Sequence, residues 1–243
     1  ERRARRMDPV RTMLPEYAAE HGIAIDAAQA EKFQTYMELL LEWNQKMNLT
    51  AITEPEAVAC RHFLDSLLPL EAYPFPEGAS VIDVGTGAGF PGIPLKIARP
   101  DLRLTLLDSL AKRLTFLGEV CAALEIDADR IHARAEEGGR RTDLRDRFDI
   151  ACARAVAPLN LLCEYCLPFV KPGGVFLSMK GPGAQEELER AGEAMRQLSA
   201  KLEDVREFTL PDGSSRTILI VRKQGRTPEK YPRHGSKIAK KPL

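Results

Sequence analysis

The stretch from residue 81 to residue 97 has the clearest chemical pattern in this 243-residue chain, with the sequence VIDVGTGAGFPGIPLKI. Asp83, Gly85, Gly87 and Gly89 form the pattern Asp-x-Gly-x-Gly-x-Gly directly after a short apolar run. Glycines at this spacing let the backbone approach a ligand closely, and they overlap the G-x-G-x-x-G pattern of dinucleotide sites. A motif this short needs further residues to identify its ligand.

Two carboxylates favour a nucleoside ligand that carries no phosphate. Asp83 stands two residues before Gly85, where it would repel a pyrophosphate but can help to hold an ammonium group. Asp108 closes the next apolar run, 23 residues after Gly85, about where an acid accepts from ribose hydroxyls. S-adenosylmethionine has both groups, so we expect it as the cofactor. A nicotinamide-dependent oxidoreductase stays an alternative, which Asp83 disfavours.

A parallel sheet is needed to bring these residues together. Short apolar runs at 79–84, 102–108, 130–135, 148–155 and 173–181 alternate with helix-length segments at 110–125, 158–168 and 184–200, which is typical of βαβ units. The runs at 201–210 and 215–223 flank a Pro-Asp-Gly-Ser turn and indicate an antiparallel end. We therefore predict a Rossmann-like α/β fold with a mostly parallel sheet, an antiparallel last strand, and the ligand at the carboxyl edge.

Helices precede this sheet. Apolar residues recur at helical spacing over 33–47 after a possible capping pair, Asp26 and Gln29, and a second helical segment covers 55–70. The sequence YPFPEG at 73–78 then breaks the chain. We divide the protein into a helical N-terminal extension (1–75), a cofactor-binding domain (76–223) and a basic C-terminal tail (224–243).

Composition indicates a soluble, cytoplasmic protein. The chain is 44% hydrophobic and 29% charged, without an apolar stretch near the roughly 18 residues of a membrane helix. The five cysteines lie in apolar contexts, which favours buried thiols over disulfides or a metal site. The net charge is zero, but residues 222–243 carry +7 and residues 1–11 carry +3. We expect the tail to contact RNA phosphates and to be dispensable for cofactor binding.

The stretch at 81–97, followed by LLDSLAKRLTFL at 106–117, resembles the bacterial small-subunit rRNA guanine-N7 methyltransferase family, RsmG, also called GidB. The likeness extends to WNQKMNLTAI, RHFLDSLLPL, ARAEE, ARAVAPL, MKG and YPRHG. It implies a class I S-adenosylmethionine-dependent methyltransferase with a helical N-terminal extension. The implied reaction is methyl transfer to N7 of a guanine in a 16S rRNA loop near the decoding site. The partner would be 16S rRNA or the 30S subunit, and we expect a monomer.

The resemblance also assigns residues, position by position. It implies cofactor contacts at Gly85, Phe90, Ala135, Glu136 and Arg154, with Asp108 on the ribose. Further positions match ones that face the cofactor pocket or the RNA in this family, namely Asn48, His62, Arg134, Lys180 and Arg216. We take Asn48, Arg134 and Arg216 as the RNA-binding candidates.

Guanine N7 has an in-plane lone pair and no proton, so its methylation needs alignment and exclusion of water but no general base. Arg154, Lys180 and His62 are therefore expected to position the guanine, the first two through O6 and phosphate. The chain also lacks the Asn/Asp-Pro-Pro-aromatic motif typical of exocyclic-amine methylation. A methyltransferase for another RNA or for a small molecule, and a non-catalytic RNA-binding module, stay open as alternatives.

Overall fold

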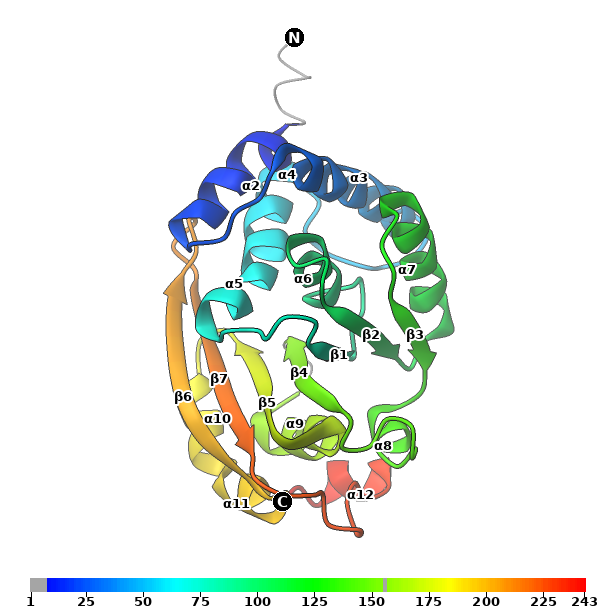
Figure 1. Cartoon of the computed structure of the whole chain (residues 1–243), viewed down its shortest axis with the longest axis vertical. Helices are drawn as coiled ribbons and strands as arrows, with labels where there is room; N and C mark the ends of the chain where they lie inside the picture. Colours follow the sequence, from blue (N-terminus) through cyan, green and yellow to red (C-terminus); the bar gives the residue numbers. More distant parts are fainter. Residues whose placement is uncertain (1–7, 155–156) are drawn as a thin grey trace.

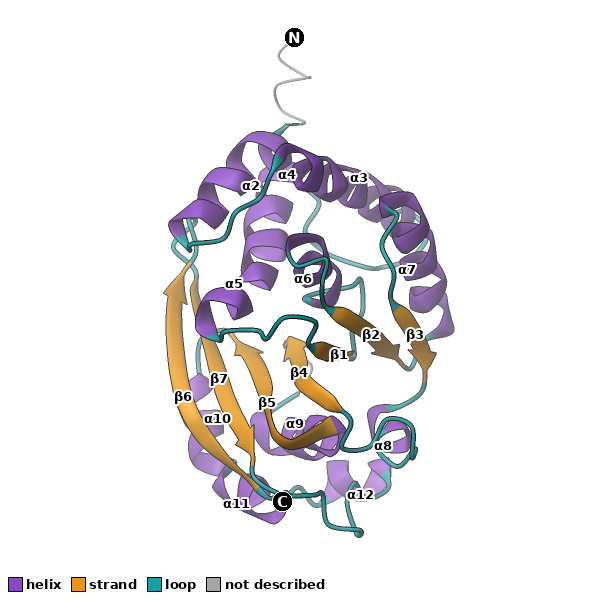
Figure 2. Cartoon of the chain, viewed as in Figure 1, coloured by secondary structure: helices purple, strands orange, loops and turns teal. Residues whose placement is uncertain are grey.

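A seven-stranded sheet forms the centre of the protein, as the computed structural model of residues 8–154 and 157–243 shows (Figures 1 and 2). Its strand order is β3-β2-β1-β4-β5-β7-β6. The neighbouring strands from β3 to β5 pair in parallel, whereas β7 is antiparallel to both β5 and β6. The predicted mostly parallel sheet with an antiparallel end is therefore confirmed. The strands are β1 (Ser80–Val84), β2 (Arg103–Asp108), β3 (Asp129–His132), β4 (Phe148–Arg154), β5 (Val170–Lys180), β6 (Ala200–Thr209) and β7 (Ser215–Lys223).

The helices agree with the sequence pattern in the middle of the chain and differ from it near the ends. The expected helix at 55–70 is a continuous run of three segments, and the expected helix at 184–200 is divided into two. Helices α2 and α12, and the short helix α8 in the middle of the chain, were not expected from the sequence pattern. The helical segments are α2 (Pro9–Glu20), α3 (Ala27–Asn44), α4 (Pro55–Ala57), the π-helical η1 (Val58–Leu64), α5 (Asp65–Ala72), α6 (Gly92–Ala98), α7 (Ala111–Leu124), α8 (Ala135–Gly138), α9 (Leu159–Cys166), the 3-10 turn η2 (Leu167–Phe169), α10 (Ala184–Arg190), α11 (Gly192–Gln197) and α12 (Gly235–Lys240).

The strands bury both faces, so the protein has two apolar cores. Successive side chains point to opposite faces of a strand; Val81 lies in one core and Ile82 in the other, and Leu106 and Leu107 divide in the same way. Helices α2, α3, α5, α6 and α7 contribute to the first core, while α9 and α11 contribute to the second. The N-terminal helices thus share a core with the sheet.

Helix α3 connects the N-terminal extension to the glycine-rich loop. It begins with the predicted capping box, in which Asp26 accepts from the backbone of Gln29 and Gln29 accepts from the backbone of Asp26. One face of α3 carries the buried Tyr36, whose hydroxyl donates to the carbonyl of Ala88 in the loop. The Tyr36 ring also packs on Phe90, with 5.5 Å between ring centroids. The extension therefore supports the loop directly.

The basic tail is folded against the domain. At the end of β7, the fully buried ammonium group of Lys223 donates to Asp146 Oδ1 at 3.0 Å and to Thr227 Oγ1 at 2.7 Å. Further along, Arg233 Nη2 forms an ion pair of 2.7 Å with the buried Glu164 of α9. Residues of the tail contribute to the second core and to the polar contacts around it, so the tail packs on the domain.

All five cysteines are free and buried, as predicted. The described residues contain no group of three or more His, Cys, Asp or Glu side chains arranged to hold a metal ion. Among residues 8–154 and 157–243, no helix has both the length and the apolar character needed to cross a membrane. The arginine-rich residues 2–6 and Ala155, the last residue of one expected strand, lie outside the described residues.

Candidate functional site

The glycine-rich loop connects β1 to α6 at the carboxyl edge of the sheet. The backbone N–H groups of Gly85 and Thr86 donate to the carbonyl of Leu107 on β2, at 2.9 and 3.0 Å. Gly87 has a φ of +58°, and a Cβ there would have no neighbouring atom within 4 Å. Gly89 is required by the packing, because a Cβ at this position would overlap the Tyr36 hydroxyl. The loop is thus closely packed at Gly89 and open in front of Gly87.

Both strand-end carboxylates hold this loop. Asp83 Oδ2 accepts from Thr86 Oγ1 at 2.7 Å and from the backbone N–H of Gly92 at 2.9 Å. Its Oδ1 has no hydrogen-bond partner among the described residues, and burial raises the pKa of Asp83 to about 7. Asp108 accepts from the N–H groups of Gly87 and Leu110, each at 2.9 Å. The expected contacts of these acids with an ammonium group and a ribose remain predictions.

A cavity of about 720 Å³ opens beyond β1, β2 and β3. This volume lies within the range of small-molecule sites. Four predicted cofactor residues line it, namely Gly85, Asp108, Ala135 and Glu136. The other lining residues are Val84, Leu107, Ser109, Arg113, Ala133, Arg134, Ala157, Leu161, Leu162, Tyr165, Gly235, Ser236 and Ala239. We call this the donor cavity; its apolar walls, glycine backbone and carboxylates fit a nucleoside joined to an amino acid.

The donor cavity changes two expectations. Five predicted cofactor residues are not among its lining residues. Asp83, Gly87, Gly89 and Phe90 lie in or under the loop that borders it, and Arg154 is the last residue of β4. The C-terminal helix α12, in contrast, contributes Gly235, Ser236 and Ala239 to the wall. Our expectation that the tail is dispensable for cofactor binding therefore gives way to the opposite one, because removing α12 would remove part of the cavity.

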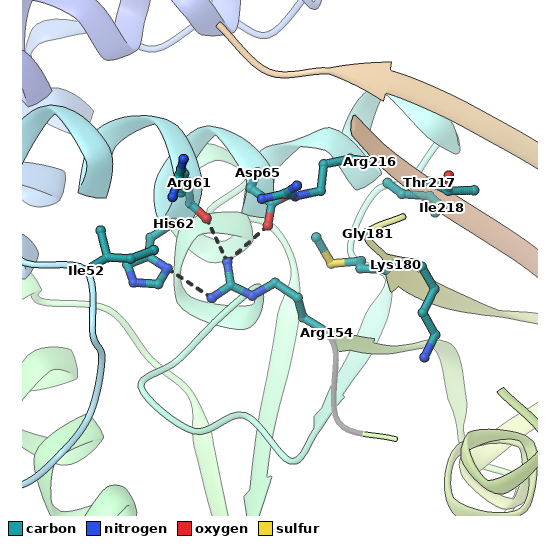
Figure 3. A pocket seen from close by; sticks show the side chains of 11 residues that line it. Ile52, Arg61, His62, Asp65, Arg154, Lys180, Gly181, Arg216, Thr217 and Ile218 are labelled. Carbon is teal, nitrogen blue, oxygen red and sulfur yellow. Dashed lines mark hydrogen bonds and ion pairs between the residues drawn. The ribbon is translucent and has the colours of Figure 1, made fainter. Parts of the chain in front are cut away.

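A second cavity, of about 340 Å³, lies beyond β4, β5 and the start of β7 (Figure 3). We call it the acceptor cavity. Four of the predicted guanine-positioning and RNA-binding residues line it together with Asp65, namely His62, Arg154, Lys180 and Arg216. The remaining lining residues are Ile52, Arg61, Met179, Gly181, Thr217 and Ile218. This cavity is smaller than the donor cavity and more strongly charged.

Asp65 organises the charges of the acceptor cavity. Its Oδ2 accepts from Arg154 Nη1 and its Oδ1 accepts from Arg216 Nε, both at 3.1 Å. Arg154 Nη1 also donates to the carbonyl of Arg61 at 3.2 Å, and its Nη2 donates to Nδ1 of His62 at 3.0 Å. Figure 3 shows the bonds from Arg61, Asp65 and His62 converging on the Arg154 guanidinium. One buried carboxylate thus fixes two arginines that come from different strands.

His62 is held as a neutral ring. Its imidazole stacks on Phe90 of the glycine-rich loop, with 4.4 Å between centroids and 11° between planes. Its Nε2 lies 2.7 Å from Thr50 Oγ1, on the opposite side from Arg154. Burial, and then the charge of Arg154, lower the pKa of His62 to about 3. The ring therefore positions Arg154 and does not carry a charge near neutral pH.

Lys180 has a supporting position. Its ammonium group donates to the carbonyl of Ala157 and to Glu187 Oε1, the latter at 3.1 Å. Glu187 Oε1 also accepts from the N–H of Leu159 at 3.1 Å. The Lys180 side chain extends away from Arg154 in Figure 3. These contacts fix the start of α9, and the predicted contact of Lys180 with guanine or phosphate remains a prediction.

The RNA-binding candidates lie at three places. Arg216 belongs to the acceptor cavity, and the exposed Arg134 lies at the wall of the donor cavity. Asn48 lines a separate hollow of about 440 Å³, which Arg113 connects to the donor cavity. This hollow has a basic rim and an aliphatic side chain, Leu110, that is 51% exposed. Its other lining residues are Lys46, Met47, Leu49, Ala111 and Lys112.

Asp65, Thr50 and α12 were not expected from the sequence to take part in the site. Asp65 follows His62 by three residues, which places both on one helical face, and this spacing was a usable signal. Thr50 and the start of α12 lie in the quoted sequences WNQKMNLTAI and YPRHG, but no local pattern shows which cavity they border.

Comparison with known proteins gives consistent results for most of the chain. A family model described as GidB, rRNA small subunit methyltransferase G, matches residues 29–218. The ribosomal RNA small subunit methyltransferase G of Alkaliphilus metalliredigens is 49% identical over 233 residues, covering 95% of this chain and 98% of the relative. The protein of the same name from Lachnoclostridium phytofermentans is 50% identical over 224 residues, covering 91% and 93%.

Solved structures share the fold at low sequence identity. The fibrillarin pre-rRNA processing protein of Methanococcus jannaschii has a TM-score of 0.52 at 13% identity, covering 63% of this chain and 70% of that one. A putative transferase from Pyrococcus horikoshii also has a TM-score of 0.52, at 11% identity, covering 65% and 62%. These similarities confirm the predicted class I methyltransferase fold.

Proposed function

The chain belongs to the rRNA small subunit methyltransferase G family, and we propose that it transfers a methyl group from S-adenosylmethionine to N7 of a guanine in 16S rRNA. The sequence resemblance suggests a loop near the decoding site as the location of this guanine. The free rRNA or the 30S subunit would be the substrate. Family membership supports the methyltransferase activity and the class of RNA, and the site supports the choice of atom.

One observation carries the proposal. The donor cavity lies beyond β1, β2 and β3, and the acceptor cavity lies beyond β4, β5 and β7 at the same edge of the sheet. The glycine-rich loop contacts the acceptor side through Phe90, which stacks on His62 and lies 4.8 Å from the Arg154 guanidinium carbon. A methyl donor and a flipped-out base could therefore meet end to end between these cavities.

The residues of the donor cavity suit the cofactor. When bound, S-adenosylmethionine supplies an electrophilic methyl group, whose bond to sulfur breaks as the bond to guanine N7 forms. Asp108 and Glu136 present carboxylates that can accept from ribose hydroxyls and from an exocyclic amino group. Asp83 lies under the glycine-rich loop, outside the lining of this cavity, and its charge favours a cationic group on the other side of the loop.

The residues of the acceptor cavity suit an unprotonated nitrogen as the methyl acceptor. Arg154 occupies the His62 lone pair at Nδ1, so His62 has no free site for a proton from the substrate. Arg154 and Arg216 can bind O6 of guanine or a neighbouring phosphate. The negative charge of Asp65 offsets the repulsion between the two guanidinium groups. Alignment by these groups replaces general-base catalysis.

Mass mapping of methylated guanines tests the proposal. Digested 16S rRNA from cells with the gene, without it, and with an Arg154→Ala copy would be compared. We expect one 7-methylguanine that disappears without the gene and decreases strongly with Arg154→Ala. An unchanged 16S rRNA pattern, or loss of a methyl group on another atom or another RNA, would overturn the assignment.

A further inference from the structure

Helix α12 completes the donor cavity from outside the range matched by the family model. The match ends at residue 218, whereas Gly235, Ser236 and Ala239 line the cavity. Figure 1 shows α12 next to α8 and α9, at the side of the sheet opposite the N-terminal helices. The contribution of α12 to the donor cavity is therefore inferred from its position in the fold.

The chain before α12 is fixed by polar contacts. The Arg145 guanidinium donates to the carbonyls of Thr227, Pro228 and Tyr231, at 3.1, 3.0 and 2.6 Å. Glu164, which is 1% exposed, accepts from the backbone N–H of Arg233 at 2.6 Å and pairs with its guanidinium. These contacts end two residues before Gly235, so α12 begins at a defined place.

The absence of a side chain at Gly235 leaves room for a predicted cofactor residue, Glu136. A Cβ at position 235 would overlap Glu136 Oε1 and lie 3.0 Å from Glu136 Cδ. The backbone at Gly235 is not in the left-handed region, so glycine is needed there for space and not for conformation. The atoms that would have to move are the end of the Glu136 side chain, which lines the donor cavity.

We propose that Gly235 is a positioning residue, whose missing Cβ leaves the space in which the Glu136 carboxylate lies at the wall of the donor cavity, where it selects the base of the methyl donor. This inference rests on the proposed function. A carboxylate accepts from the 6-amino group of adenine but opposes the 6-carbonyl oxygen of hypoxanthine. Displacing the Glu136 carboxylate should therefore weaken the adenosyl ligand more than the inosyl ligand.

Calorimetry with two ligands tests this inference on the full chain. S-adenosylhomocysteine and S-inosylhomocysteine would be titrated into the wild type, Gly235→Ala, Glu136→Asp and the double variant. Gly225→Ala is the matched control in the same segment, because its Cβ would meet only Ser199, at 3.7 Å. Melting temperatures of all variants report whether each one folds.

For Gly235→Ala we expect about tenfold weaker binding of the adenosyl ligand and a smaller preference over the inosyl ligand. The melting temperature should stay near that of the wild type, because a flexible side-chain end can move. Glu136→Asp shortens the acid and makes room, so adding Gly235→Ala to it should cost less than about twofold. Gly225→Ala should bind like the wild type.

Three results would each contradict this inference and leave the proposed function standing. They are wild-type affinity in Gly235→Ala, an equal loss of affinity for both ligands, and an equal effect of Gly235→Ala when position 136 is Asp. If the wild-type protein binds neither ligand, the proposed function fails, and this inference fails with it.

Discussion

Arg154 Nη2 donates a hydrogen bond to Nδ1 of His62 over 3.0 Å. A neutral imidazole has one acceptor nitrogen, so this bond assigns the hydrogen to Nε2, which faces Thr50 Oγ1 at 2.7 Å. The pKa of His62, lowered to about 3 by burial and by Arg154, keeps the ring neutral near physiological pH. His62 is therefore a support for Arg154 and lacks the free lone pair of a general base.

The methylation rate should consequently not depend on the titration of His62. We expect the single-turnover rate, with cofactor and RNA saturating, to be nearly flat from about pH 6 to 9. His62→Ala should slow the reaction by loosening Arg154 and leave the profile flat. A wild-type rate that rises tenfold per pH unit below neutrality, with this rise absent in His62→Ala, would contradict base-free transfer.

Asp65→Ala should impair catalysis severely. The buried carboxylate is the shared partner of Arg154 and Arg216, and its loss leaves two guanidinium groups facing each other. We expect a rate at least tenfold lower, or about 1.4 kcal/mol, and a stability loss of about 3 kcal/mol.

Asp212→Ala is the matched control for this variant. Asp212 pairs with Arg61, whose side chain is 49% exposed, close to the same cavity. An exposed pair contributes little, so both the rate and the melting temperature should stay near wild type. Equal losses of rate and of melting temperature in the two variants would contradict the role of Asp65 in holding Arg154 and Arg216.

Cofactor binding should release a proton from Asp83 in mildly acidic solution. The pKa of Asp83 is raised to about 7 by burial, so the carboxyl is mostly protonated at about pH 6. A cationic ammonium group of the cofactor near the glycine-rich loop would favour the charged form of Asp83 and displace that proton. Above about pH 8 the carboxylate is already ionised, and release should vanish.

Calorimetry in two buffers of different ionisation enthalpy measures this proton. Asp83→Asn keeps the shape of the side chain and removes the titration, so it should release none at either pH. Identical proton release in the wild type and Asp83→Asn would exclude Asp83 as its source.

Gly87→Val should weaken S-adenosylmethionine binding at least tenfold, or about 1.4 kcal/mol. The added side chain would enter the open space in front of the loop. Gly213→Val is the control, since Gly213 also has a positive φ and open surroundings but lies in the β6–β7 turn. Both substitutions introduce the same kind of backbone strain. Equal S-adenosylmethionine affinity in the two variants would therefore show that the ligand does not approach the backbone at Gly87.

The hollow around Asn48 should contact RNA phosphates. In Lys46→Ala/Lys112→Ala, binding of a 16S rRNA fragment should weaken, and the salt slope should fall by about 1.4 for two lost phosphate contacts. Arg190→Ala/Lys201→Ala removes two exposed cations from α10 and β6 and should leave the slope unchanged. Fluorescence anisotropy at several salt concentrations measures both; an unchanged slope in the first variant would place the RNA elsewhere.

The sequence by itself determined the parts that depend on local patterns. Alternating apolar runs and helix-length segments specified a mostly parallel sheet, and Asp26 with Gln29 specified the start of α3. The spacing of Asp83, Gly85 and Asp108 located the donor side, because residues at adjoining strand ends must share one edge of a parallel sheet.

Only the tertiary structure decided how the charged groups are paired. Arg154 and His62 are 92 residues apart in the chain, and Asp65 joins Arg154 to Arg216 across three elements. Helix α12 reaches Glu136 only because the tail folds back along α9. Local propensity describes the backbone near a residue, whereas these contacts depend on how distant elements pack, so no short-range pattern contains them.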